Sequence, residues 1–126
     1  MSDKPIRILI VDDELQIREA IKFFLEDMEY EAYTAGSVKE TFIVLEKVEF
    51  HIIIVDLILP DGDGEELIKD IAEKHPTIKF IIHTGSISYT PSDHLKKLGI
   101  SKENVLLKPF KDILDLENAI KLVLNK

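Results

Sequence analysis

The sequence HIIIVD at residues 51–56 decides the fold class. Four consecutive apolar residues, three of them isoleucine, are followed by a single carboxylate, Asp56. A strand with one face in water would alternate apolar and polar residues, so an unbroken apolar run favours a strand that is covered on both faces. Strands of this kind are typical of parallel sheets with helices on both sides. The stretch therefore predicts an α/β fold with Asp56 at the carboxyl end of a buried strand.

Outward from this stretch, strand-like and helix-like segments alternate along the whole chain. Apolar, β-branched runs predict four further strands, at residues 6–11, 30–35, 78–83 and 104–107. Helical periodicity predicts helices near residues 14–28, 38–48, 65–75, 92–98 and 113–124. Five such β/α repeats with right-handed crossovers favour a doubly wound, five-stranded parallel sheet with five helices, whose sites form at the carboxyl ends of the strands.

Two local patterns refine this outline. Ser37 is predicted to cap a helix, and Glu40 three residues later would complete a capping box. The loop after Asp56 is rich in turn formers, and we interpret Pro60, Gly62 and Gly64 as turn chemistry that shapes this loop.

Composition limits the classes of function. The chain has 126 residues, which suits one domain over residues 1–126, and we expect no output domain within it. It contains no cysteine and no apolar run long enough to cross a membrane, so we expect a cytoplasmic protein without membrane contacts. The net charge of −8 argues against direct nucleic-acid binding by this domain.

Polar residues at the ends of four predicted strands carry the chemistry. The first strand is followed by Asp12 and Asp13, the third ends at Asp56, the fourth is followed by Thr84, and the fifth by Lys108. Three carboxylates would then share one pocket, where their repulsion favours binding of a hard cation such as Mg²⁺. Each residue alone has an ordinary interpretation; Asp12 and Asp13, for example, could form a turn and a helix N-cap. Their joint occurrence indicates a site that holds a phosphoryl group beside a carboxylate.

The order of these residues resembles that of the receiver domains of bacterial response regulators (the CheY-like family). The resemblance covers the whole chain and includes VDDE at 11–14, DLILPDGDG at 56–64, TG at 84–85 and KPF at 108–110. It implies a flavodoxin-like sheet with strand order 2-1-3-4-5. It also implies a phosphoacceptor that catalyses only its own phosphorylation and dephosphorylation, within two-component signalling.

The resemblance assigns a role to each acidic residue. Asp56 would be the phosphoacceptor. Asp13 and Asp56 would ligate Mg²⁺ directly, with the backbone carbonyl of Ile58 as a third ligand, and Asp12 would reach the metal through water.

The resemblance also assigns the remaining pocket residues. Thr84 would bind one phosphoryl oxygen and Lys108 another. Gly85 would leave an opening for the phosphodonor. Pro109 resembles the family proline that follows a cis peptide bond, which would aim the Lys108 amine into the pocket.

The sequence departs from the family at the switch. Thr84 is present, but Val105 stands where the family has a tyrosine or phenylalanine. Tyr89, in the loop after Thr84, could take over the role of that ring, although we expect an exposed loop tyrosine. Strand alternation predicts that His83 points away from the pocket and is packed or hydrogen-bonded.

The implied partners are a sensor histidine kinase or a histidine phosphotransfer protein as the donor, and a downstream protein as the target. The alternatives are a degenerate receiver that serves only as an interaction module, a Mg²⁺-dependent aspartyl phosphatase or phosphotransferase, and a flavodoxin-like cofactor binder. The aspartyl phosphatase families have a DxD motif on the first strand, whereas the two acids here are adjacent. A flavodoxin-like cofactor binder is disfavoured because the acidic residues of DDEL would repel the phosphate of FMN.

Overall fold

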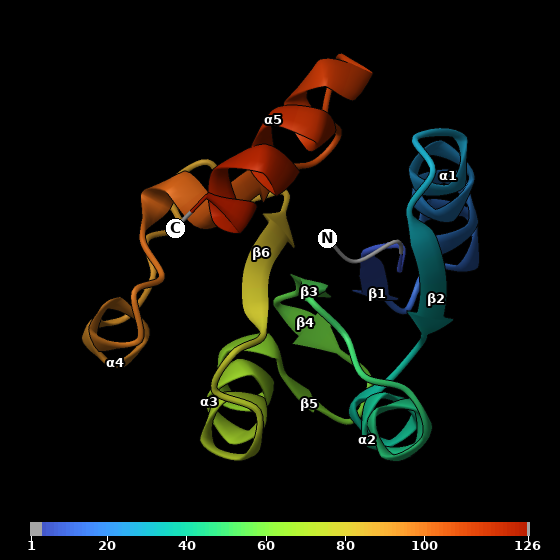
Figure 1. The fold of residues 1–126 in the computed structure, drawn as a ribbon. Helices are drawn as coiled ribbons and strands as arrows, with labels where there is room; N and C mark the ends of the chain where they lie inside the picture. The colour runs from blue at the N-terminus through green and yellow to red at the C-terminus, as the bar shows by residue number, and fades with distance from the viewer. Residues whose placement is uncertain (1–3, 126) are drawn as a thin grey trace.

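A five-stranded parallel sheet forms the centre of the protein, whose computed structural model describes residues 4–125 (Figure 1). Its strands are β1 (Arg7–Val11), β2 (Glu31–Ala35), β3 (Ile52–Asp56), β6 (Lys79–Thr84) and β7 (Val105–Leu107). They lie in the order β2-β1-β3-β6-β7, and every neighbouring pair is parallel. The predicted doubly wound sheet and its 2-1-3-4-5 order are therefore confirmed.

Helices cover both faces of the sheet. They are α1 (Leu15–Asp27), α2 (Val38–Lys47), α3 (Gly64–Lys74), α4 (Asp93–Lys97) and α5 (Ile113–Leu124). In Figure 1, α1 and α5 lie on one side of the sheet, and α2 and α3 lie on the other. Each side has its own hydrophobic core, and successive residues of β1 alternate between them: Ile8 and Ile10 on the α1/α5 side, Leu9 and Val11 on the α2/α3 side.

The apolar segment at residues 51–56 occupies the middle of this arrangement. Every residue of β3 is buried, because β1 and β6 pair with it on either side and helices cover both of its faces. Asp56 is the last residue of β3, so its carboxylate lies where the buried strand reaches the edge of the sheet.

The segment after Asp56 is more ordered than the predicted loop. Residues Ile58–Leu59 (β4) and Gly62–Asp63 (β5) form a small antiparallel hairpin. Gly64 then passes against the backbone of β3: a Cβ at this position would lie 2.4 Å from the carbonyl oxygen of Asp56. The interpretation of Gly64 as simple turn chemistry was therefore incomplete, because its missing side chain lets the hairpin pack directly behind Asp56.

The capping box predicted for α2 is only half formed. The Ser37 hydroxyl accepts a hydrogen bond from the backbone N–H of Glu40 at 3.1 Å, as expected. The Glu40 carboxylate, however, accepts from the N–H of Gly36 at 3.0 Å instead of the N–H of Ser37.

A second cap on α2 comes from a distant part of the chain. The carboxylate of Asp61, between β4 and β5, accepts from the N–H of Val38 at 2.7 Å and from that of Lys39 at 3.0 Å. These two bonds lower the pKa of the exposed Asp61 carboxyl below its usual value. They join the hairpin behind Asp56 to the start of α2.

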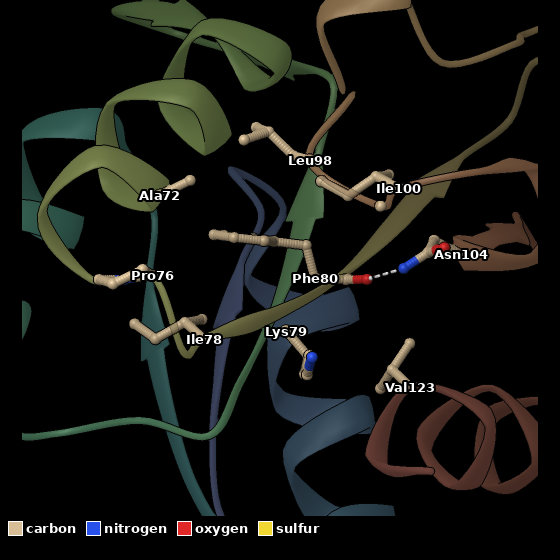
Figure 2. Close-up of a pocket in the computed structure, with 10 residues that line it drawn as sticks. Ala72, Pro76, Ile78, Lys79, Phe80, Leu98, Ile100, Asn104 and Val123 are labelled. Carbon is tan, nitrogen blue, oxygen red and sulfur yellow. Dashed lines mark hydrogen bonds between the residues drawn. The ribbon is translucent and has the colours of Figure 1, made fainter. Parts of the chain in front are cut away.

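A cavity of about 210 Å³ lies at the amino-terminal end of β6, beside α3 (Figure 2). Its lining is largely apolar, with Phe80, Leu98 and Ile100 among the contributing residues. Asn104 is the last residue of the short 3-10 helix η1 (Lys102–Asn104). Its side-chain amide donates to the Phe80 carbonyl at 2.8 Å. None of the residues predicted to carry chemistry lines this cavity. No helix among residues 4–125 combines the length and hydrophobicity needed to span a membrane.

Candidate functional site: an acidic pocket at the strand ends

Three carboxylates converge at the carboxyl ends of β1 and β3. Asp12, Asp13 and Asp56 each offer an oxygen atom, and these atoms all lie within 4.8 Å of one another. Asp12 is 1% exposed and Asp56 9% exposed, whereas Asp13 faces solvent. They meet because β1 and β3 are neighbours in the sheet, as the sequence predicted.

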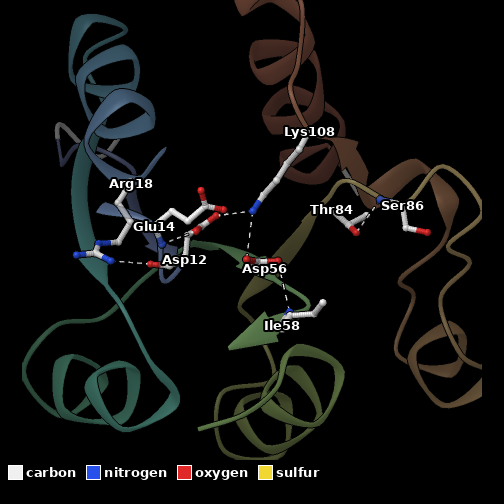
Figure 3. Close-up of polar contacts among 8 residues, drawn as sticks. All are labelled: Asp12, Glu14, Arg18, Asp56, Ile58, Thr84, Ser86 and Lys108. Carbon is white, nitrogen blue, oxygen red and sulfur yellow. Dashed lines mark hydrogen bonds and ion pairs between the residues drawn. The ribbon is translucent and has the colours of Figure 1, made fainter. Parts of the chain in front are cut away.

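The ammonium group of Lys108 lies between two of these carboxylates (Figure 3). Its Nζ is 2.8 Å from Asp12 Oδ2 and 3.1 Å from Asp56 Oδ2. Burial alone would lower the pKa of Lys108, but the two carboxylates outweigh burial and raise the pKa above its usual value. The lysine therefore stays charged. One ammonium cannot balance three carboxylates, so the residues present fit a hard divalent cation with oxygen ligands.

Lys108 reaches this position from the end of β7. The peptide bond between Lys108 and Pro109 is cis, as the resemblance implied. The backbone N–H of Lys108 donates to the Thr84 carbonyl at 2.8 Å, which joins the end of β7 to the end of β6.

Backbone contacts hold Asp12 in place. Its N–H donates to the Ala35 carbonyl at 3.1 Å, and its own carbonyl accepts from Arg18 Nη1 at 2.8 Å. Its carboxylate accepts from the N–H of Glu14 at 2.9 Å (Figure 3). The N-cap residue of α1 is Glu14, without a side-chain cap bond. Of the ordinary interpretation of Asp12 and Asp13, the turn is present, because the Asp12 carboxylate accepts from the N–H two residues further on. The helix N-cap is wrong, because the helix begins after both residues.

Thr84 and Gly85 form the opposite wall of the site. With Asp13, Asp56, Ile58 and Lys108 they line one open pocket of about 730 Å³. The Thr84 hydroxyl oxygen accepts from the N–H of Ser86 at 3.2 Å. Apart from its two chain neighbours, no atom lies within 4 Å of a Cβ placed on Gly85, so the pocket is open at this residue.

A family comparison identifies this arrangement. Residues 8–121 match the model of the response regulator receiver domain. The chain belongs to this family. It is 33% identical over 113 residues to the regulatory protein VanR of Enterococcus faecium, covering 90% of this chain and 46% of VanR. The chain thus spans less than half the length of curated relatives such as VanR.

Solved structures of receivers have the same fold. The chemotaxis response regulator CheY4 of Vibrio cholerae is 26% identical, with a TM-score of 0.79 over 95% of this chain and 99% of CheY4. The response regulator TrrA of Thermotoga maritima, solved in complex with Mg²⁺ and BeF, is 29% identical, with a TM-score of 0.79 over 94% of this chain and 98% of TrrA. This protein is a phosphoacceptor receiver of two-component signalling, and it carries the acidic cluster at which receivers bind Mg²⁺.

The position of the absent aromatic ring is on β7 of this receiver. Val105 pairs with Ile82 of β6 and is half-buried against the core on the α2/α3 side. Valine has too little volume to move between a buried and an exposed position as a ring would, so β7 offers no large switching side chain here.

Tyr89 differs from its expectation. It is half-buried instead of exposed, packs against the core on the α2/α3 side, and lines the pocket beside Thr84. Its hydroxyl donates to the carboxylate of Glu65 at the start of α3. No sequence pattern signals this contact, because the two residues are 24 positions apart and belong to different elements. Glu14 and Ser86 also line the pocket, and their positions next to Asp13 and Gly85 were the available signal.

His83 lies outside the pocket on the α1/α5 side of β6, as strand alternation predicted. It is 4% exposed, and its ring lies 5.9 Å from the ring of Phe110. Burial, and secondarily the charge of Lys108, lower the pKa of His83 to about 4, although Asp12 opposes this change. The imidazole is therefore neutral at physiological pH and packs as a core residue.

Proposed function

We propose that Asp56 of this receiver accepts a phosphoryl group from a phosphohistidine, on either a sensor histidine kinase or a histidine phosphotransfer protein. One observation carries the proposal: the Asp56 carboxylate ends a buried strand, opens into the pocket, and lies 3.1 Å from an ammonium group. Phosphorylation would change the surface that a downstream protein binds.

In the reaction, a carboxylate oxygen of Asp56 attacks the phosphorus atom. The new P–O bond forms as the P–N bond to the imidazole breaks, and the bonding electron pair leaves with the ring nitrogen. Lys108 would transfer one of its contacts to a phosphoryl oxygen, and the Thr84 hydroxyl would donate to another. Such a reaction depends mainly on positioning and on charge neutralisation. Attack by water on the acyl phosphate later restores the carboxylate.

The acidic cluster would hold the cation. Asp13 and Asp56 would ligate Mg²⁺, with the Ile58 carbonyl as a third protein ligand and Asp12 acting through water. When bound, Mg²⁺ offsets negative charge on the carboxylates and on the transferred group. The exposure of Asp13 supports its role, because an exposed carboxylate can bind a cation that keeps most of its water.

The assignment of Asp56 is tested with acetyl phosphate and Mg²⁺. The wild-type protein should gain one phosphoryl group by mass spectrometry, and Asp56→Asn should gain none. Asp27→Asn, which alters an exposed aspartate at the end of α1, is the matched control and should be labelled like the wild type. Equal labelling of Asp56→Asn would refute the proposal.

The metal site is tested by titrating Mg²⁺ into Asp13→Ala. Removing this carboxylate should abolish both Mg²⁺ binding and phosphorylation while the fold stays intact, because Asp13 lies outside the hydrophobic core. An unchanged Mg²⁺ affinity would show that the site lies elsewhere.

A further inference from the structure

A single carboxylate ties the segment after β6 to the start of α3. Glu65, in the first turn of α3, accepts from the Tyr89 hydroxyl and also from the backbone N–H of Ser92 at 3.3 Å. Ser92 is the N-cap residue of α4. One side chain of α3 therefore holds both the loop that borders the pocket and the beginning of the next helix.

Tyr89 connects this anchor to the pocket. Its ring is half-buried against the core on the α2/α3 side and lines the same pocket as Asp56 and Thr84. Burial, followed by the hydrogen bond to Glu65, raises the pKa of the Tyr89 hydroxyl above its usual value. The hydroxyl thus stays protonated and acts as a donor to a charged acceptor, a hydrogen bond stronger than one between neutral groups.

Backbone bonds continue the connection to the threonine. The N–H of Tyr89 donates to the Ser86 carbonyl at 3.3 Å, and the N–H of Ser86 donates to the Thr84 hydroxyl oxygen at 3.2 Å. The Thr84 side chain is thereby engaged by its own loop. A movement of Thr84 toward a phosphoryl group on Asp56 would have to break the bond to Ser86 or carry the turn with it, and Glu65 holds the other end of that turn.

We infer that Tyr89 and Glu65 are positioning residues that restrain phosphoryl capture: their contact holds residues 84–92 in the arrangement in which the Thr84 hydroxyl is bonded to Ser86. This inference rests on the proposed function of Asp56. A contact formed in one of two states shifts their equilibrium by its own differential free energy. Loss of the Tyr89–Glu65 contact should therefore favour the arrangement in which Thr84 binds the phosphoryl group, and should strengthen capture.

The test measures the affinity of the protein for beryllofluoride, a phosphoryl mimic, in the presence of Mg²⁺, from the NMR shift of the Gly85 amide. Tyr89→Phe removes the hydroxyl and keeps the ring. It should bind beryllofluoride at least about tenfold more tightly than the wild type, as expected for a charge-assisted hydrogen bond that is lost in the captured state. Glu65→Ala should give the same direction, and the double variant should add little, because both changes remove one contact.

The chain provides a matched control. The Tyr33 hydroxyl donates to Glu31 Oε1 at 2.7 Å, and Tyr33 packs against the same core, but neither residue lines the pocket. Tyr33→Phe removes an equivalent hydroxyl from an equivalent contact, so its beryllofluoride affinity should equal that of the wild type.

The outcomes separate this inference from the proposed function. If the wild type binds beryllofluoride and Asp56→Asn does not, the phosphoacceptor assignment stands. A Tyr89→Phe affinity equal to or weaker than that of the wild type then overturns the positioning role alone. If the wild type does not bind beryllofluoride, the assignment of Asp56 as the phosphoacceptor is refuted, and the inference that rests on it is refuted as well. Should Tyr89→Phe fail to fold, Glu65→Gln carries the test, because it removes the charge of the acceptor and keeps a side chain of the same size.

Discussion

The two walls of the pocket are built differently. The wall of β1 and β3 carries the acids at the ends of two buried, paired strands. The backbone of Asp12 is fixed by its N–H bond to the Ala35 carbonyl and by the Arg18 side chain, which donates to the Asp12 carbonyl. Behind this wall, Gly64 packs against the Asp56 carbonyl without room for a side chain.

The other wall consists of the end of β6 and residues 85–92, and its loop is less closely packed. Residues 85–88 are exposed, Gly85 has no neighbour within 4 Å of a Cβ position, and the Tyr89–Glu65 contact anchors the loop from its far end. The wall that holds the reacting carboxylate is therefore packed closely, whereas the exposed residues 85–88 of the other wall can move without disturbing a core.

Glycine substitutions give the largest contrast between the walls. In Gly64→Ala, the new methyl group would collide with the backbone of β3, so we expect a loss of at least about 3 kcal/mol in the free energy of unfolding. Gly85→Ala should change it by less than about 0.5 kcal/mol, because the site is open. Chemical denaturation of both variants measures this difference; similar losses would contradict the contrast.

Lys108, which connects the walls, should give the next largest effect. Lys108→Met leaves the buried Asp12 and Asp56 carboxylates without their cation, and we expect a loss of about 2 kcal/mol in the absence of divalent metal, in the range for hydrogen bonds to charged groups. Added Mg²⁺ should raise the melting temperature of the variant more than that of the wild type, because the metal replaces the missing charge. An equal Mg²⁺ effect on both proteins would show that the metal and Lys108 do not act on the same carboxylates.

His83, on the far face of β6, should make stability depend on pH. Its pKa of about 4 in the folded protein lies below the ordinary value of about 6.5, so between these pH values the unfolded chain binds a proton that the folded chain does not. Stability should fall as the pH drops through this window, by about 1–2 kcal/mol between pH 7 and pH 5. His83→Leu should lose this part of the pH dependence. Denaturation curves at pH 7 and pH 5 measure this difference in the free energy of unfolding. If His83→Leu loses as much stability between the two pH values as the wild type, another group is responsible.

The smallest effect is expected on β7. Beryllofluoride with Mg²⁺ should shift backbone NMR signals strongly at residues 85–92 and weakly at Val105–Leu107, since Val105 provides no ring to move. Shifts on β7 as large as those in the loop would show that this strand takes part in switching after all.

The sequence predicted the closely packed wall better than the responsive one. The strand order follows from alternating β/α repeats, and Asp12, Asp13, Asp56, Thr84 and Lys108 meet because parallel strands end at one edge of the sheet. The alternation of strand-like and helix-like periodicity along the chain is enough to predict both the strand order and the meeting of these residues.

Contacts between loops have no such signature. The β4–β5 hairpin, the close approach of Gly64 to Asp56 and the Tyr89–Glu65 contact join residues whose separation is set by the packed fold and not by a repeat. The Ser37 cap was predictable from the local sequence. The Glu40 carboxylate accepts from the N–H of Gly36 instead of that of Ser37, because a carboxylate at a helix start can accept from either of two neighbouring amides.

The cap that Asp61 places on α2 affects hydrogen exchange. The first amides of a helix have no carbonyl partner within it and ordinarily exchange quickly with solvent. In this protein the N–H groups of Val38 and Lys39 are bound by Asp61, so they become accessible to deuterium only when the β4–β5 hairpin moves away. The hydrogen-exchange rate of these two amides would therefore report how often the hairpin behind Asp56 opens while α2 stays folded.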